Sequence, residues 1–280
     1  YSLGYLGGGL LFAVNVAMTL KPEFFGLADA TQAVKVSFIT VSVWWAVFTI
    51  PLLTGVREQL RAPMAGAATN AVREGLRQIA DTFHEIRALR PVLLFLAAYV
   101  IYIDGVGTVI RMAVDFGLSL GFPSESLIIA LLIVQFVGFP AALVFGSVGK
   151  RLGPRTGIFI GLGVYMFATI WGSRMESVKE FYFLAILIGL VQGAVQSLSR
   201  SLYARLIPPD KSGEFFGFYN MLGKFAAIIG PTLMGTVSKL TESTRMGILS
   251  LVVLFLGGGA LLTMVRVRNT EPEPELTQVG

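Results

Sequence analysis

Eight long apolar runs divide this sequence, and they constrain its fold more than any other feature does. A helix crosses the hydrocarbon core of a bilayer, which is about 30 Å thick, in roughly 20 residues. Only helices and closed barrels satisfy their backbone hydrogen bonds in lipid, and barrel strands would be alternating runs of about ten residues. The sequence therefore predicts an all-α membrane protein with eight transmembrane helices. We expect them at residues 1–20, 35–56, 91–113, 125–147, 156–173, 180–204, 215–238 and 246–266.

The composition excludes several classes of protein. Hydrophobic residues make up 54% of the chain and charged residues 14%, whereas an ordinary globular protein carries about 25% charged residues. A soluble domain is excluded on this ground, and so is a disordered chain, which needs low hydrophobicity and high charge. With no cysteine and one histidine, a disulfide framework, a thiol nucleophile, an iron–sulfur cluster and a zinc site lack ligands. We therefore expect neither a metal nor a cofactor.

The basic residues indicate how the chain crosses the membrane, because cytoplasmic loops carry an excess of Lys and Arg. Fourteen of these residues lie in, or at the span ends next to, the alternate connections that include 57–90 and the C-terminus, and six lie in or next to the others. The remaining two, Arg111 and Lys224, lie inside spans. The 57–90 connection and the C-terminus are thus predicted to be cytoplasmic.

The connection 57–90 is the one long loop between predicted spans. Its apolar residues recur at spacings of four, three, four and three, which is typical of an amphipathic helix on the membrane surface or against the bundle, or, as an alternative, of a partner-binding helix. They are Val72, Leu76, Ile79, Phe83 and Ile86. His84 in this helix is interpreted as solvated, because a second histidine of a zinc-protease motif is lacking.

The order of the spans predicts the domain organisation. Two spans, a long loop and six spans are typical of a transporter made of two six-helix halves. Residues 1–56 would be the last two helices of the N-terminal bundle, 57–90 the cytoplasmic linker, and 91–268 a complete C-terminal six-helix bundle. The tail at 269–280 is charged, broken by prolines and expected to be disordered. Four N-terminal helices of the same protein would then be missing partners.

A loop motif and several longer stretches carry a family resemblance. The loop 146–155 is similar to the second, weaker signature of the major facilitator superfamily, although Lys150 stands in the slot of an acidic residue and Pro154 in a basic slot. The stretches YSLGYLGGGL (1–10), YIDGVGTVIR (102–111), QSLSRSLYARLIP (196–208) and EFFGFY (214–219) resemble the vacuole-effluxer-like branch of that superfamily. The residues that match the loop signature are Gly146, Gly149, Arg151, Gly153 and Arg155.

This resemblance implies a function. It implies an incomplete major-facilitator fold that transports a small solute by alternating access, coupled to protons or facilitative. The substrate of the eukaryotic relatives is an amino acid. The partners would be the lipid bilayer, the solute and a proton, and no nucleic acid.

Asp104 is the first candidate for a transport site. A charge at mid-bilayer costs at least ~2.5–3.5 kcal/mol, so such a residue should face the interior of the bundle. At 100° per residue, Thr108 and Arg111 fall on the same face of the helix. Asp104 would bind a proton or an ammonium group of the substrate, with Arg111 as its pairing residue or as an outer gate. The alternative is an ion pair that only fixes helix packing.

Lys224 is the second candidate, ten residues into its span with Asn220 one turn before it. Neither membrane interface is within easy reach of this side chain, so it needs a carboxylate, helix-end carbonyls or a water-filled cavity. We consider a pair between Lys224 and Asp104 across a central cavity, although the missing helices could equally supply the partner.

Neutral amides form a third group of candidates. Gln192 and Gln196 share a helix face with Ser199 and Tyr203. Amides suit a substrate that needs hydrogen bonds without a fixed charge, but the alternative is interhelical hydrogen bonding of ~0.6 kcal/mol per bond. Candidates for a cytoplasmic gate, or for contacts with lipid phosphates, are Arg200, Arg205 and Glu214.

The sequence argues against an enzyme. An intramembrane aspartyl protease needs a second Asp in a Gly-x-Gly-Asp context on another span, and the order around Asp104 is reversed. A P-loop for ATP hydrolysis is also lacking. The remaining alternative to a transporter is a lipid scramblase or a partner-dependent membrane subunit without solute transport. It would be favoured if Asp104 and Lys224 faced lipid.

Overall fold

The structure is a computed structural model that describes residues 2–56 and 71–265, and this part of the chain is helical without a strand. The fold class predicted from the apolar runs is thus confirmed as an all-helical membrane protein. The α-helices are α1 (Ser2–Leu20), α2 (Ala30–Gly55), α3 (Ala71–Ala88), α4 (Arg90–Ser119), α5 (Ser124–Leu152), α6 (Pro154–Gly172), α7 (Val178–Ala204), α8 (Ser212–Phe225), α9 (Ile229–Thr241), α10 (Thr244–Ser250) and α11 (Val252–Thr263). Short 3₁₀ turns are η1 (Pro22–Phe25), η2 (Pro209–Lys211) and η3 (Ala226–Ile228).

Seven helical stretches of the described chain are long and apolar enough to cross a membrane. They correspond to seven of the eight predicted spans, with α8, η3 and α9 forming one stretch and α10 and α11 another. The remaining predicted span, 156–173, corresponds to α6, which has 19 residues but is not among the seven. Four glycines and Arg155 lower the hydropathy of α6. The count of eight therefore stays a prediction, and seven spans are supported by the described helices.

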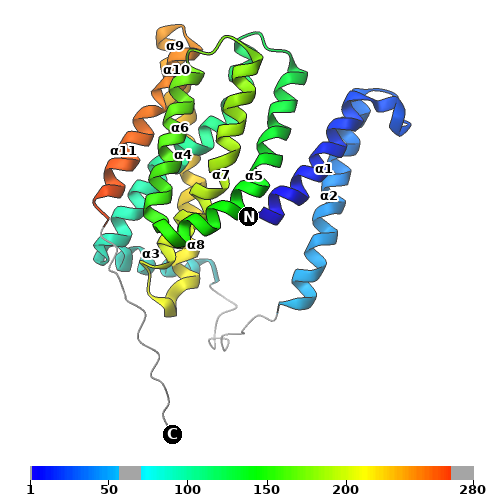
Figure 1. The fold of residues 1–280 in the computed structure, drawn as a ribbon. Coiled ribbons are helices and arrows are strands. Elements are labelled where there is room, and N and C mark those ends of the chain that lie inside the picture. The colour runs from blue at the N-terminus through cyan, green and yellow to red at the C-terminus, as the bar shows by residue number, and fades with distance from the viewer. Residues whose placement is uncertain (1, 57–70, 266–280) are drawn as a thin grey trace.

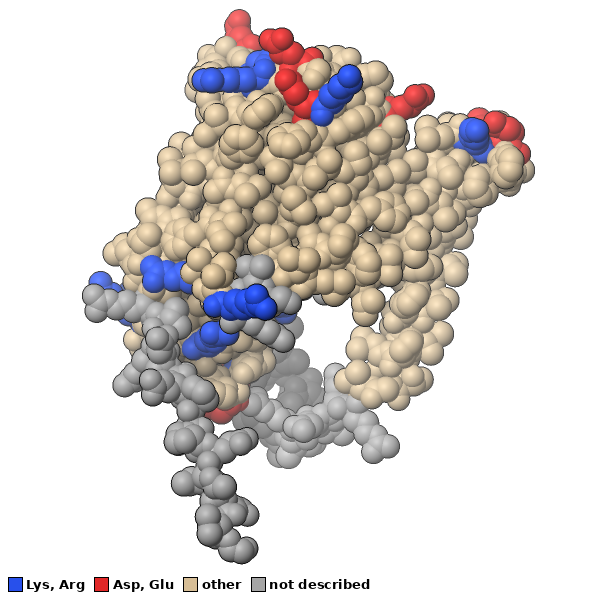
Figure 2. Space-filling view, viewed as in Figure 1, with Lys and Arg blue, Asp and Glu red and all other residues tan. Residues whose placement is uncertain are grey.

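Helices α4 to α11 form one bundle, and α1 and α2 form a hairpin beside it (Figure 1). Within the bundle, α7 packs between α5 and α6, and α4 packs on α11. Helix α1 packs on α5, whereas α2 packs mainly on α1 and the turn between them, and only Ala33 of α2 is buried. Lys and Arg side chains gather at the lower end of the bundle, and both signs of charge lie at the upper end (Figure 2). On the face shown in Figure 2, the surface between these two charged bands carries no Lys, Arg, Asp or Glu side chain, as expected for a part that contacts lipid tails.

Glycines allow close helix contacts at two places. A Cβ atom on Gly258 of α11 would lie 2.7 Å from Cβ and 2.9 Å from the backbone N of Tyr102 on α4. The ring of Tyr5 on α1 lies where Cβ atoms on Gly138 of α5 and Gly193 of α7 would stand, at 2.9 Å in both cases. Small residues of this kind let membrane helices approach where no hydrophobic force drives them together.

The predicted amphipathic helix is present as α3, and it packs against the bundle. Ile86 is 1% exposed, the ring of Phe83 lies 6.2 Å from that of Phe218 on α8, and Lys211 forms an ion pair with Glu85. The side chains of Val72 and Leu76 lie outside the described residues. His84 is exposed, as predicted.

The predicted span 215–238 is interrupted in its middle. Helix α8 ends at Phe225, η3 makes one tighter turn, and α9 begins at Ile229. Pro231 explains the break, because a proline has no backbone N–H and its ring clashes with the preceding turn. A 3₁₀ stretch inside a helix often marks a hinge.

Candidate functional site

Asp104 lies near the centre of α4, and its side chain has no exposed surface. Oδ2 accepts a hydrogen bond from the backbone N–H of Gly230 in the first turn of α9. Oδ1 lies 3.5 Å from Thr108 Oγ1, which donates to it, and 3.6 Å from Nη2 of Arg111. The carboxylate is therefore shared between two groups of its own helix and the backbone of another span.

The Gly-Pro pair in α9 explains why the carboxylate can reach this backbone. The first N–H groups of a helix have no partner within it, and Gly230 is the second residue of α9. A Cβ atom on Gly230 would stand 3.1 Å from Oδ2 of Asp104 and 2.2 Å from Oγ1 of Thr108. Any other residue would displace one of these side chains. The acid at position 104 thus stabilises the start of α9, where the N-terminal end of a helix favours a negative charge.

Arg111 connects this buried acid to the surface. Its side chain is 46% exposed, and Nη2 lies 3.5 Å from Oγ1 of Thr108 as well as near Asp104. A buried carboxylate is stable only with charge compensation and hydrogen bonds, and Arg111, Thr108 and Gly230 provide both. The polar stripe predicted on this helix is present, with one end buried and the other open.

Lys224 does not pair with Asp104, so the hypothesis of a pair across the cavity is wrong for this structure. Lys224 is exposed in the last turn of α8, with Asn220 exposed one turn before it. Asp104 instead lies level with Gly230, six residues further along, which is about 9 Å at 1.5 Å per residue. One turn of α8 contacts α4 through Gly223, the residue before Lys224. A Cβ atom on Gly223 would lie 3.1 Å from the hydroxyl of Tyr99.

The amide face of α7 separates into two parts. Ser199 and Tyr203 are buried: the hydroxyl of Tyr102 on α4 lies 2.7 Å from Oγ of Ser199, and the hydroxyl of Tyr203 donates to the carbonyl oxygen of Phe215 over 3.0 Å. These two residues therefore form hydrogen bonds between helices, which is the alternative to substrate binding that we considered for this face.

Gln192 and Gln196 precede these residues on the same helix face and are half-buried. The Oε1 atom of Gln192 is buried and has no hydrogen-bond partner. A buried acceptor of this kind is costly unless something else bonds to it.

Of the cytoplasmic gate candidates, Arg200 lies against aromatic rings near the end of α7. Arg200 is exposed, and its guanidinium carbon lies 5.5 Å from the ring centroid of Phe216 and 6.0 Å from that of Tyr219. Arg205 is also exposed, and Glu214 is half-buried. Arg200 is thus held by cation–π contacts of ~0.5–1 kcal/mol at an exposed site.

Three of the loop signature residues have structural roles at the turn from α5 to α6. Gly153 has φ +81° between the two helices, where a Cβ atom would be strained. A Cβ atom on Gly149 would lie 2.4 Å from Leu198. Arg155 donates to the carbonyl oxygen of Thr263 at the end of α11, over 2.5 Å. Of the others, Gly146 and Arg151 are exposed, and the side chain of Lys150 lies outside the described residues.

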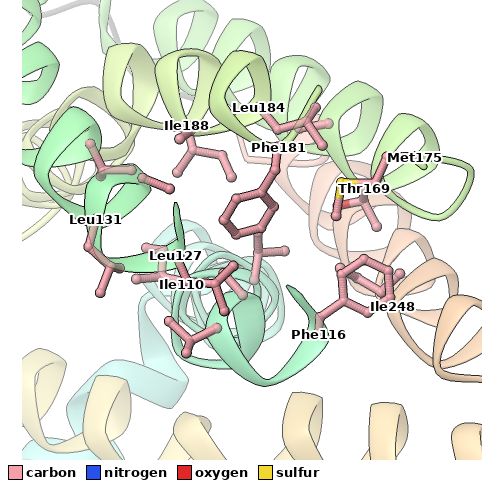
Figure 3. Close-up of a pocket in the computed structure, with 18 residues that line it drawn as sticks. Ile110, Phe116, Leu127, Leu131, Thr169, Met175, Phe181, Leu184, Ile188 and Ile248 are labelled. Atoms are coloured by element: carbon pink, nitrogen blue, oxygen red, sulfur yellow. The ribbon is translucent and has the colours of Figure 1, made fainter. Parts of the chain in front are cut away.

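A cavity of about 70 Å³ lies between α4, α5, α6, α7 and α10. Apolar side chains such as Phe181, Leu127 and Ile110 point into it (Figure 3). Thr169 supplies the one polar side chain of the lining, and its hydroxyl already donates to the carbonyl of Tyr165 over 2.8 Å. A space of this kind stays dry and offers a polar solute no partner. The polar candidate site is therefore the Asp104 cluster.

Two residues of this cluster escaped the sequence reasoning. Gly230 and Pro231 stand together inside a predicted span, and a Gly-Pro pair in an apolar helix is a signal for a break. Tyr5 was not predicted either, because one sequence does not show that its ring faces two glycines on other helices.

The family model described as "Vacuole effluxer Atg22 like" matches residues 1–275. The MFS-type transporter YxiO of Bacillus subtilis is 35% identical over all of this chain and 64% of its own length. Autophagy-related protein 22-1 of Aspergillus niger is 26% identical over 95% of this chain and 46% of its own length. Autophagy-related protein 22 of Cryptococcus neoformans is 26% identical, with coverages of 95% and 50%. The chain thus spans less than two thirds of these relatives. No solved structure matches it.

Proposed function

The chain belongs to the family of Atg22-like vacuole effluxers, and from this membership we propose that it is part of a secondary transporter that moves a small solute by alternating access. It is an integral membrane protein, and its Bacillus relative is named as a transporter. The solute that we propose is an amino acid, exchanged with or driven by protons. A lipid scramblase is not favoured, because the family model describes a vacuole effluxer and the Bacillus relative is named as a transporter.

We assign the helices to the two halves of such a transporter as follows. Helices α1 and α2 are the last two of the first half, α3 is the linker, and α4 to α11 are the second half, with α6 as its third span. Four preceding helices would complete the first half. The basic residues at the lower end of the bundle support a cytoplasmic position for that end, in the inner membrane of a bacterium (Figure 2).

The observation that carries the proposal is the ion pair between Asp104 and Arg111. Its acid is fully buried in a span, while its base is 46% exposed and open to a solute. When Asp104 takes a proton, Arg111 loses its counter-charge and can bind an anionic group of the solute. Intramembrane ionisable residues of this kind mark proton and solute pathways.

The exposed face of α8 gives the solute further partners. Asn220 and Lys224 lie on this face, and α4 packs against the same helix. We propose that this face, with Gln192 and Gln196 of α7, lines a pathway shared with the first half of the transporter. In that assembly Lys224 would face water or a carboxylate rather than lipid tails.

Transport by the full-length protein in proteoliposomes tests the proposal. Uptake of a panel of radiolabelled amino acids is measured with and without a pH gradient, for the wild type, Asp104→Asn and Asp115→Asn. Asparagine keeps an oxygen for the N–H of Gly230 but removes the charge, so we expect gradient-driven uptake to be lost. Asp115 is an exposed acid of the same helix and serves as the matched control. Equal uptake by wild type and Asp104→Asn would refute the role of Asp104.

A further inference from the structure

We propose that Gly230 is a positioning residue for Asp104: its N–H holds one carboxylate oxygen at the break of the α8–α9 span, so that the other oxygen stays turned toward Thr108 and Arg111. This inference rests on the proposed function of Asp104, and it adds the residue that orients the acid and the helix that would respond to its charge.

The two carboxylate oxygens have different partners. Oδ2 is bonded to a backbone N–H of α9, whereas Oδ1 lies 3.5 Å from Thr108 and 3.6 Å from Arg111 on α4. The bond of Oδ2 fixes the rotation of the carboxyl group, because a backbone donor cannot turn away as a side chain can. Oδ1 is thereby the oxygen that faces the half-exposed arginine, and it is the one that a proton or an ammonium group would reach.

Glycine is the residue that this arrangement needs. A methyl group at position 230 would stand 2.2 Å from Oγ1 of Thr108 and 3.1 Å from Oδ2 of Asp104. The first distance is far below any normal contact, so Thr108 or the backbone of α9 must move. The second distance is also tighter than an ordinary contact, so the carboxyl group of Asp104 must move away and its bond with the N–H of Gly230 lengthens. Gly235, on the same helix, has no atom within 4 Å of a Cβ position.

The position of Gly230 also explains why the charge of Asp104 would act on α9. Pro231 has no N–H, so Gly230 supplies a donor directly before a residue that lacks one. Helix α4 packs on α8, η3 and α9 around this break. Neutralising Asp104 weakens its attraction for the N-terminal end of α9. The hinge of this span is thus bonded to the residue whose charge changes in the proposed transport cycle.

The groups that face the carboxyl define what a pH measurement would report. Arg111 is the charged group that acts on it, from its own helix, and Thr108 and the N–H of Gly230 are the hydrogen-bond donors. Helix α11 presents the apolar Leu254 and Phe255 next to Asp104, at Gly105. The N–H of Gly230 is therefore one of the donors that stabilise the charged carboxylate.

The test compares Gly230→Ala with Gly235→Ala in the full-length protein. Proton-driven uptake of the amino acid found for the wild type is measured in proteoliposomes between pH 5 and pH 9. We expect Gly230→Ala to move the midpoint of the pH profile upward by about one pH unit, since a lost hydrogen bond to a charged group corresponds to a shift of about this size. Gly235→Ala should keep the wild-type midpoint. An unshifted profile for Gly230→Ala overturns the proposal.

A second measurement covers the case in which Gly230→Ala does not fold. Hydrogen exchange of the peptide 228–234 is followed in the wild type and in Asp104→Ala, with the peptide 235–241 as the internal control. We expect Asp104→Ala to accelerate exchange at the amide of Gly230 by about tenfold or more and to leave the control peptide unchanged. Equal exchange of Gly230 in both proteins refutes the inference. Active Asp104→Asn would instead refute the proposed function, so the two failures are distinguishable.

Discussion

The contact between α4 and α11 at Gly258 predicts the effect of a single methyl group. In Gly258→Ala, the new Cβ atom would stand 2.7 Å from Cβ of Tyr102, 2.9 Å from its backbone N and 3.1 Å from the carbonyl oxygen of Ala98. Two of these three atoms belong to the backbone of α4, so no side-chain rotation relieves the clash. The two helices must separate by several tenths of an ångström along their contact.

The size of the effect follows from two opposing terms. Overpacking a well-packed site costs ~1–3 kcal/mol, and we expect the upper end of this range because backbone atoms resist. Replacing a glycine within a helix by alanine increases the stability of the helix by about 1 kcal/mol. The net loss of unfolding free energy for Gly258→Ala is thus about 2 kcal/mol, which changes the folded-to-unfolded ratio by a factor of about 30.

The neighbouring glycines provide matched controls. Cβ atoms on Gly257 and Gly259 would each meet one atom, at 3.9 Å, which is ordinary contact. Both alanine variants should be neutral or up to about 1 kcal/mol more stable than the wild type. Unfolding by SDS in detergent micelles, followed by tryptophan fluorescence and far-UV circular dichroism, gives the midpoint for each variant. Equal midpoints for all three alanine variants would refute the reasoning.

Other contacts predict further differences, each measurable in the same unfolding assay. Ser199→Ala should destabilise by ~1–3 kcal/mol because it leaves the buried hydroxyl of Tyr102 without a partner, whereas Tyr102→Phe should cost less because Ser199 still donates to its own helix backbone. Ile86→Ala removes the buried contact of α3 and should cost ~2–5 kcal/mol; unchanged protease sensitivity of the linker would contradict it. Glu85→Gln breaks a half-exposed ion pair with Lys211 and should cost at most about 1 kcal/mol, vanishing at high salt.

The sequence predicted the helices well because a bilayer imposes a simple length and polarity requirement. Seven of the eight runs appear as candidate spans, and the four-three spacing in the linker appears as α3 with Ile86 buried. The break at Pro231 was also readable in principle, since proline acts locally. The second break, at Leu251 between α10 and α11, has no proline beside it from which it could be predicted.

The candidate site was predicted only in part. The stripe of Asp104, Thr108 and Arg111 follows from the helical period, and the structure brings these side chains together. The proposed contact with Lys224 was wrong because it depended on the rotation and the relative height of two helices. The donor on the other span is a backbone N–H at Gly230, and a search for charged partners does not consider backbone groups.

The lengths of the helices have a consequence for the depth of the ion pair. Helix α4 has 30 residues and is about 45 Å long, so it exceeds a 30 Å hydrocarbon core and must tilt or project. Asp104 is the fifteenth of its residues, at the point about which such a tilt turns. We therefore expect its distance from the bilayer midplane to stay nearly constant in thin and thick membranes, while Arg90 and Ser119 at the two ends of the helix change their depth.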